Sequence, residues 1–291
     1  MKHAAAAGVL RIGELCVNRM GFGAMRVCGP HVWGMPKDPA AARKLLVQAF
    51  DLGHNFFDTA DSYGPAVSET LIAEALHPYP PDLVIGTKGG LVRPTRWAWD
   101  EDGRPEHLCQ ALEGSLKRLR LERIDLYQFH APDPKVPFAE SVGMLAELQR
   151  NGKIQHLGLS NIDVNQLNEA RRIVTIVSVQ NEYNLGNRKC DDVLSACEKA
   201  GIAFIPWFPL GAGRALHSRK VKRIAAQRGA KPAQVALAWL LARSPVMLPI
   251  PGTSSIAHLK ENVQGALIKL SPEDVAALSG KRSWSGATRS E

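Results

Sequence analysis

Short apolar runs recur along the whole chain and alternate with segments of helical periodicity. Runs with the character of buried strands lie at 20–25, 55–60, 83–88, 124–130, 156–161, 176–182, 203–209 and 246–251. Strands that are apolar on both faces are typical of a parallel sheet covered by helices. Helical patterns lie between them at 39–52, 66–76, 106–119, 138–150, 164–172, 191–200 and 232–243. This alternation predicts an α/β fold, a (β/α)8 TIM barrel.

The two ends of the chain fall outside this alternation. Residues 8–19 hold two short strand-like runs joined by a Gly-Glu turn, which predicts an N-terminal β-hairpin closing the barrel floor. Residues 283–291 are small and polar and are expected to fray. Because no composition break separates the units, we expect 1–291 to form a single domain. A doubly wound dinucleotide fold is disfavoured because Arg26 occupies the third glycine position of its GxGxxG fingerprint.

Composition and charge exclude several classes of protein. Of 291 residues, 45% are hydrophobic and 22% charged, as in ordinary globular domains. No apolar run reaches the ~18 residues of a membrane helix, and no secretory signal is recognisable, so we expect a cytoplasmic protein. The net charge is +8, but the basic residues are scattered, which disfavours a nucleic-acid partner. The five cysteines lack CxxC spacing, so we expect reduced thiols and no metal site.

Polar side chains stand at the ends of the predicted strands, where barrel enzymes carry their catalytic groups. Asp58, Lys88 and His130 each end a strand, and Tyr63 lies in the loop after Asp58. A buried salt bridge between the aspartate and the lysine is one interpretation. The other is an acid–base set in which the lysine lowers the pKa of the tyrosine and the aspartate orients the lysine. A neutral histidine opposite would then hydrogen-bond a carbonyl oxygen that is protonated as hydride reaches its carbon.

Motifs in order on successive strand ends resemble those of the aldo-keto reductase superfamily. They are FDTADSYG at 57–64, TK at 87–88, His130, GLSN at 158–161 and IPGT at 250–253, and the resemblance spans about 8–270. The resemblance implies reduction of aldehydes or ketones by NAD(P)H, with a catalytic tetrad of Asp58, Tyr63, Lys88 and His130 and with Tyr63 as general acid. The runs NEYN at 181–184 and AHL at 257–259 are most similar to a bacterial branch that includes enzymes reducing pyridoxal to pyridoxine.

The same resemblance implies a nicotinamide cofactor extended across the barrel mouth. Its expected contacts are Gly23, Ala24, Met25, Asp58, Ser160, Asn161, Gln180, Trp207, Pro209, Leu210, Gly211, Pro251, Gly252, Thr253, Ser254, His258, Glu261 and Asn262. For Trp207, an ordinary core tryptophan is the alternative. Many relatives carry Lys and Arg where this chain has Gly252 and His258, which weakens the expected grip on a 2′-phosphate. Thr253, His258 and Lys260 can still form a phosphate cradle, so we expect NADPH (NADP+) to be preferred, with NADH as the alternative.

The loops at the predicted mouth are short, which favours an open site and a broad range of aldehydes. Tryptophans beside arginines make Trp33, Arg93, Arg96 and Trp97 candidate contacts for a flat or anionic substrate, and ordinary loop packing is an equal alternative. We expect a small-molecule carbonyl substrate, no nucleic acid and no membrane partner, and a monomer or weak homo-oligomer. A function of another class is a cofactor-binding regulatory or redox-sensing subunit with little turnover.

Overall fold

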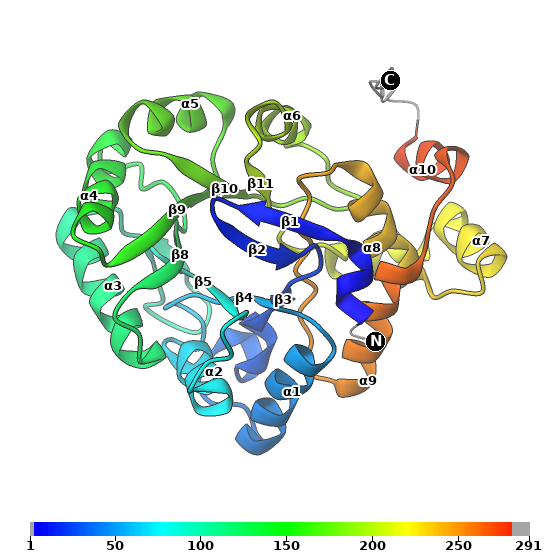
Figure 1. The fold of residues 1–291 in the computed structure, drawn as a ribbon, viewed down its shortest axis with the longest axis horizontal. Helices are drawn as coiled ribbons and strands as arrows, with labels where there is room; N and C mark the ends of the chain where they lie inside the picture. The colour runs from blue at the N-terminus through cyan, green and yellow to red at the C-terminus, as the bar shows by residue number, and fades with distance from the viewer. Residues whose placement is uncertain (1–2, 281–291) are drawn as a thin grey trace.

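The computed structural model describes residues 3–280 and shows a ring of parallel strands inside a ring of helices (Figure 1). One seven-stranded parallel sheet has the order β11-β10-β9-β8-β5-β4-β3. Its strands are β3 (Phe22–Gly23), β4 (Phe56–Asp58), β5 (Val84–Gly89), β8 (Ile124–Phe129), β9 (Ile154–Ser160), β10 (Ile176–Gln180) and β11 (Ala203–Phe204). The predicted barrel fold is confirmed.

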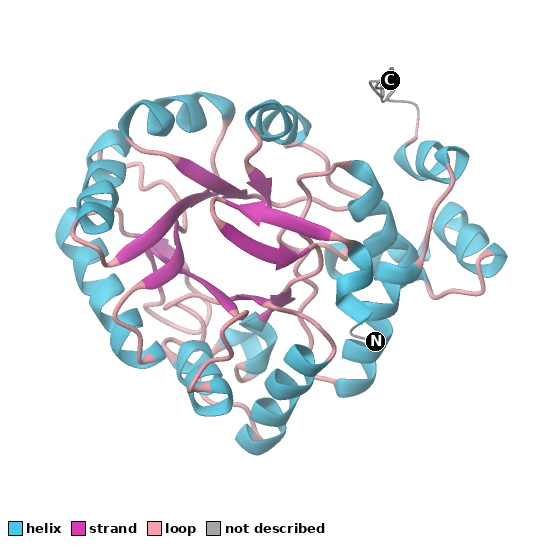
Figure 2. Cartoon of the chain, viewed as in Figure 1, coloured by secondary structure: helices cyan, strands magenta, loops and turns pink. Residues whose placement is uncertain are grey.

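Helices follow the strands and cover the outer face of the sheet (Figure 2). They are α1 (Pro39–Asp51), α2 (Val67–Leu76), α3 (Pro105–Leu119), α4 (Phe138–Arg150), α5 (Val164–Ile173), α6 (Asp191–Ala200), α7 (Arg219–Gln227), α8 (Pro232–Arg243), α9 (Ile256–Val263) and α10 (Pro272–Ser279). Local signals set their ends: the Asp38 side chain accepts a hydrogen bond from the Ala41 N–H at the start of α1, and Gly201 ends α6 with φ +65°.

The eighth predicted strand, at 246–251, closes the ring without forming a regular strand. The Phe204 N–H donates to the Val246 carbonyl at 2.8 Å, and the Leu248 N–H donates to the Phe204 carbonyl at 2.9 Å. On the other side, the Gly21 N–H donates to the Pro249 carbonyl at 3.0 Å. Proline lacks the N–H that a regular ladder requires. The expected full strand was therefore wrong, although the barrel still closes through this segment.

An antiparallel hairpin fills the floor of the barrel. β1 (Val9–Ile12) pairs with β2 (Leu15–Asn18), and Figure 1 shows both strands lying across the centre of the ring. Ile12 and Val17 are buried in one apolar cluster with Phe56, Leu126 and Leu248 from the barrel interior. The hairpin expected within 8–19 is confirmed, and it seals this end of the barrel.

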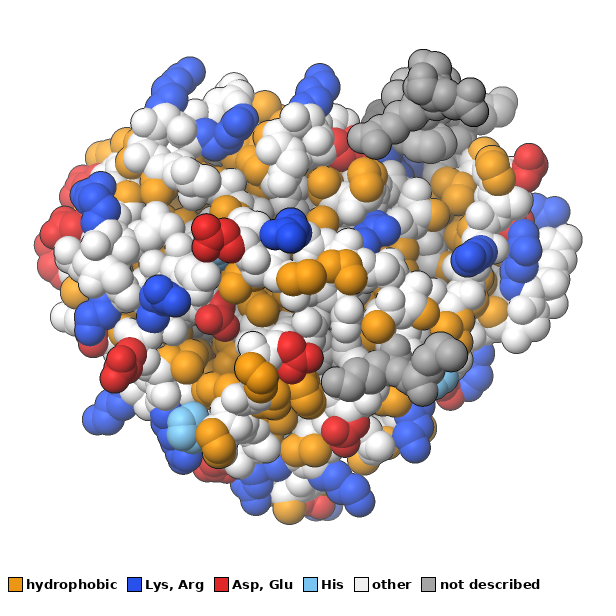
Figure 3. Space-filling model, viewed as in Figure 1, with side chains coloured by type: hydrophobic (Ala, Val, Ile, Leu, Met, Phe, Trp, Pro, Cys, Tyr) orange, Lys and Arg blue, Asp and Glu red, His pale blue; other side chains and the backbone are white. Residues whose placement is uncertain are grey.

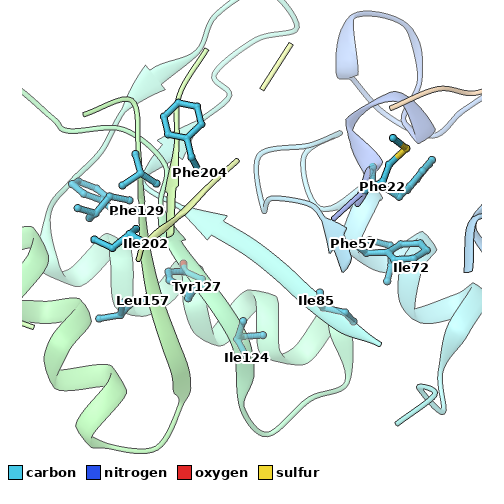
Figure 4. Packing of buried hydrophobic residues seen from close by; sticks show 14 of the residues in the cluster. Phe22, Phe57, Ile72, Ile85, Ile124, Tyr127, Phe129, Leu157, Ile202 and Phe204 are labelled. Carbon is cyan, nitrogen blue, oxygen red and sulfur yellow. The ribbon is translucent and has the colours of Figure 1, made fainter. Parts of the chain in front are cut away.

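The main core lies between the sheet and the helices. Figure 4 shows Ile124, Tyr127 and Leu157 from neighbouring strands, and Phe22 beside Phe57, whose ring centroids are 5.4 Å apart. The outside is mixed in character: Figure 3 shows basic side chains dispersed among acidic and apolar ones over one face. Within residues 3–280, no helix is both long and apolar enough to cross a membrane. The expected frayed tail at 283–291 lies outside the described residues.

Candidate active site

A cavity of about 790 Å³ opens at the carboxyl ends of the strands. The predicted site residues on its wall are Gly23, Met25, Asp58, Tyr63, His130, Ser160, Asn161, Gln180, Trp207, Pro209, Leu210, Pro251, Gly252, Thr253, Ser254 and His258. Among the described residues, those predicted for the site but absent from this wall are Ala24, Trp33, Lys88, Arg93, Arg96, Trp97, Gly211, Glu261 and Asn262. The structure thus gathers residues from distant parts of the chain at the end where barrel enzymes carry their active sites.

The Asp58 and Lys88 side chains form a buried ion pair beneath the cavity. Lys88 Nζ donates to Asp58 Oδ1 at 2.7 Å and to the Thr59 carbonyl at 2.8 Å. Asp58 ends β4, and Lys88 lies near the end of the neighbouring parallel strand β5, two residues after the Asp58 partner Gly86, so both side chains lie on the same face of the sheet. Burial lowers the pKa of Lys88, whereas the Asp58 charge acts to raise it. The pair therefore holds a cation at a fixed position below the cavity wall.

Tyr63 brings a phenol from the cavity wall to this cation. Lys88 Nζ lies 3.5 Å from Tyr63 Oη, at the limit of a hydrogen bond, and 5.1 Å from the ring centroid. Burial raises the pKa of Tyr63 well above its ordinary value of 10, and the nearby Asp58 carboxylate raises it further. The net direction is opposite to the lowering expected from Lys88, because desolvation is the largest effect and the Asp58 charge adds to it. The phenol therefore holds its proton at neutral pH.

His130 faces Tyr63 across the site. The two ring centroids are 5.9 Å apart at an interplanar angle of 76°, and Ser62 Oγ lies 3.4 Å from His130 Nδ1. Burial and the Lys88 charge lower the pKa of His130 well below 6.5. The imidazole is therefore neutral near pH 7 and has one ring N–H to donate.

The second carboxylate oxygen of Asp58 is held by two buried amides. Gln180 Nε2 donates to Asp58 Oδ2 at 2.7 Å, and Gln128 Nε2 lies 3.3 Å from the same oxygen. Gln128 is in turn 3.5 Å from Ser178 Oγ through its own carbonyl oxygen. Gln128 was not among the predicted residues, although a polar side chain near the end of the largely apolar run 124–129 is a readable signal. These amides fix the orientation of the carboxylate that holds Lys88.

A half-buried aromatic ring and several amides line the neighbouring part of the cavity. Trp207 Nε1 donates to Asn161 Oδ1 at 3.0 Å, and Asn161 Nδ2 donates to the His130 carbonyl at 2.9 Å. Ser160 Oγ donates to the Gln180 carbonyl at 2.8 Å. Trp207 is therefore a fixed, flat surface open to the cavity, and the alternative of an ordinary core tryptophan does not describe it.

The far end of the cavity lies at the start of α9. Ser255 caps this helix by accepting a hydrogen bond from the His258 N–H, and the Ser255 N–H donates to Thr253 Oγ1 at 3.0 Å. Backbone N–H groups at a helix N-terminus favour anionic groups. Glu261 points elsewhere, since its carboxylate pairs with Lys231. The exposed His258 side chain also lines the cavity at this end of the helix.

The four residues predicted to contact substrate lie in two loops that pack against each other. Arg93 is buried, and its guanidinium donates to four backbone carbonyls: those of His31, Val32, Arg96 and Ala98. The N–H groups of Arg93 therefore hold the two loops together, which agrees with the alternative of ordinary loop packing.

The two tryptophans that follow Arg93 differ in their position relative to the cavity. Trp97 is 70% exposed and contacts the His31 ring at 4.3 Å between centroids. Trp99, which was not predicted, lines the cavity.

Other unpredicted lining residues come from segments that sequence patterns do not resolve. They are Arg26, Leu91, Phe208, Gly213, Leu216 and Ile250. Leu91 belongs to a two-residue strand, β6 (Leu91–Val92), paired with β7 (Asp100–Glu101), and Phe208 adopts a positive φ of 51°. Such short pairings and local backbone turns leave no periodicity to read. Among the described residues, no group of three His, Cys, Asp or Glu side chains is placed to hold a metal ion.

The arrangement can deliver a proton to a group bound in the cavity. A protonated phenol, a fixed ammonium beneath it and a neutral imidazole opposite converge on one region of the wall. The ammonium stabilises the phenolate that remains after proton donation, and the imidazole can hydrogen-bond an acceptor oxygen. This chemistry suits a substrate oxygen that gains negative charge during the reaction.

Comparisons with known proteins agree with this geometry. The model of the aldo/keto reductase family matches residues 19–282. The chain is 47% identical over 289 residues to an uncharacterized oxidoreductase of Schizosaccharomyces pombe, covering 99% of this chain and 94% of the relative. It is 43% identical over 282 residues to pyridoxine 4-dehydrogenase of Escherichia coli, covering 94% and 98%. A solved aldo-keto reductase from Klebsiella pneumoniae in complex with NADPH has a TM-score of 0.78 and 28% identity, covering 93% of each chain.

Proposed function

The chain belongs to the aldo/keto reductase family, and from this premise we propose that it reduces aldehydes to alcohols with NADPH, using Tyr63 as the proton donor. The observation that carries the proposal is the phenol of Tyr63 on the cavity wall, 3.5 Å from an ammonium that Asp58 holds in place. A buried ion pair without a neighbouring cavity would only stabilise the fold. Here the lysine of the pair contacts a protonated phenol that lies on the cavity wall, which is the arrangement that proton transfer to a bound substrate requires.

The proposed reaction follows from these groups. NADPH supplies, when bound, the hydride that the carbonyl carbon accepts. The neutral His130 donates a hydrogen bond that orients the carbonyl oxygen. Tyr63 Oη gives its proton to that oxygen, which becomes the alcohol hydroxyl, and the Lys88 ammonium stabilises the phenolate left behind. Asp58 keeps Lys88 charged and oriented throughout, and Gln128 and Gln180 hold Asp58.

The cavity wall fits a flat-ringed, anionic cofactor. Trp207 offers a fixed aromatic face next to the amide and hydroxyl groups of Asn161 and Ser160. At the other end, Thr253 and His258 stand at the N-terminus of α9, where phosphate groups are favoured. We propose that NADPH is preferred over NADH, because Thr253 and His258 lie on the cavity wall at this helix start, whereas the Glu261 carboxylate lies against Lys231 and is not part of that wall.

The proposed substrates are small aldehydes and ketones, and pyridoxal is a specific candidate. The name of the Escherichia coli relative, pyridoxine 4-dehydrogenase, supports this candidate. The cavity volume of about 790 Å³ is within the usual range for a small-molecule site.

A turnover assay tests the proposal. The purified protein is given NADPH or NADH with a panel of aldehydes that includes pyridoxal, and loss of the reduced nicotinamide absorbance is followed. Rapid, NADPH-preferring turnover that is lost in Tyr63→Phe is the expected result. Tight retention of the cofactor with negligible turnover of every aldehyde would instead support the regulatory or redox-sensing alternative.

A further inference from the structure

Trp99 forms part of the cavity wall beside the proposed proton donor. Its ring centroid is 6.3 Å from that of Tyr63 at an interplanar angle of 77°, and 36% of the residue is exposed. The next residue, Asp100, begins β7, which pairs with β6 and fixes the backbone at this point. A large aromatic ring that stays accessible so close to the reacting group calls for an explanation other than core packing.

The indole is backed by a cation. The Arg93 guanidinium carbon lies 3.7 Å from the Trp99 ring centroid, which is a close cation–π contact. The same guanidinium carbon lies 5.5 Å from the ring centroid of Trp33, in the loop after β3. Because Arg93 also donates to four loop carbonyls, it is itself held rigidly. The indole is thus positioned before any ligand arrives.

The same cavity also has apolar side chains on its wall, among them Leu91, Phe208 and Leu216. Aromatic rings attract one another at centroid separations of about 4.5–7 Å, in offset or edge-on arrangements. The Tyr63 and Trp99 rings are 6.3 Å apart, so the substituent of a carbonyl bonded to Tyr63 Oη has the indole within reach.

From this arrangement we propose that Trp99 is a specificity-determining residue, which receives the ring of an aromatic aldehyde. Arg93 is the positioning residue that holds the indole for this contact. The inference rests on the proposed reductase function and deepens it, by naming flat aromatic aldehydes as the favoured substrate class of the site.

The test compares two aldehydes of similar size and different shape, benzaldehyde and cyclohexanecarbaldehyde. In Trp99→Leu, we expect KM to rise about 2- to 10-fold more for benzaldehyde than for cyclohexanecarbaldehyde, because only benzaldehyde loses an aromatic pair. Trp97→Leu is the matched control, because Trp97 lies in the same loop outside the cavity. Equal changes for the two aldehydes, or the same change in Trp97→Leu, would overturn the proposal.

A binding measurement separates this inference from the reductase proposal. Benzamide and cyclohexanecarboxamide have the same two shapes and cannot be reduced as aldehydes are, so their Kd for the NADPH-loaded protein can be measured by calorimetry. Weaker benzamide binding in Trp99→Leu, with cyclohexanecarboxamide unchanged, supports the aromatic platform even if no aldehyde is turned over. Turnover of both aldehydes with no effect of Trp99→Leu on either amide refutes the platform and leaves the reductase function in place.

Discussion

Replacing Tyr63 by Phe removes one hydroxyl group and leaves its surroundings almost intact. Lys88 keeps its bonds to Asp58 at 2.7 Å and to the Thr59 carbonyl at 2.8 Å, and loses only the contact of 3.5 Å to the phenol. One hydrogen bond at the limit of its range contributes less than about 1 kcal/mol to folding. The proton donor, by contrast, is lost completely, and general acid catalysis typically contributes about 10²–10⁴-fold. We therefore expect kcat to fall by about 10²–10⁴-fold in a stably folded protein.

Three measurements on Tyr63→Phe and the parent protein check this reasoning. Steady-state kinetics with an aldehyde gives kcat, fluorescence titration gives the Kd for NADPH, and denaturant unfolding gives the free energy of unfolding. We expect only kcat to change substantially, because the phenol projects toward Lys88 and His130. Near-normal kcat in Tyr63→Phe would show that another group donates the proton. A large loss of stability would instead show that the hydroxyl serves the fold.

Other expected outcomes concern stability, closure of the barrel and cofactor choice. Burial lowers the pKa of His54 to about 4, so at this group the unfolded chain binds more protons than the folded one between about pH 6.5 and 4. The contribution of His54 to stability should fall by about 2 kcal/mol from pH 7 to pH 5, and denaturant unfolding at the two pH values should show that difference between the parent protein and His54→Gln. In Gly252→Ala the new Cβ would lie 2.4 Å from the Gly23 carbonyl oxygen, so we expect a loss of about 1–3 kcal/mol. Gly143→Ala, in open space on a helix, should gain about 0.5–1 kcal/mol, and equal melting temperatures for the two glycine variants would contradict this. His258→Ala should narrow the ratio of NADPH to NADH affinity by about three- to tenfold, since an exposed charged contact is weakened by water; an unchanged ratio in fluorescence titrations would remove this residue from 2′-phosphate recognition.

Periodicity in the sequence predicts the barrel because each strand is buried on both faces and each helix on one. It fails at 246–251, where prolines remove ladder donors and the segment closes the ring by a few backbone bonds. The hairpin at β1 and β2 is predictable, since its turn and its alternating pattern are local. The pairing of β6 with β7 is not, because strands of two residues carry no period.

The site residues could be proposed from the sequence because a polar side chain buried at the end of an apolar strand is unfavourable unless it has a partner or a function. The pKa values of these residues could not be predicted from the sequence. The pKa of Tyr63 depends on how deeply the phenol is buried and on how close the Asp58 charge lies to it, and the local sequence gives neither quantity. Arg93 likewise looks like a ligand contact in the sequence, and only the path of two loops shows that it donates to their carbonyls.

The hydrogen bonds from Arg93 to the two loops have a consequence for how the protein can be redesigned. Arg93 binds the main chain of both loops at the carbonyls of His31, Val32, Arg96 and Ala98. Side chains at those four positions can therefore be exchanged one at a time without removing an acceptor of Arg93. Changing the length of either loop alone would strand buried carbonyls without a donor. Grafting a new mouth from a relative should accordingly succeed only when both loops and their shared arginine are transferred as one unit.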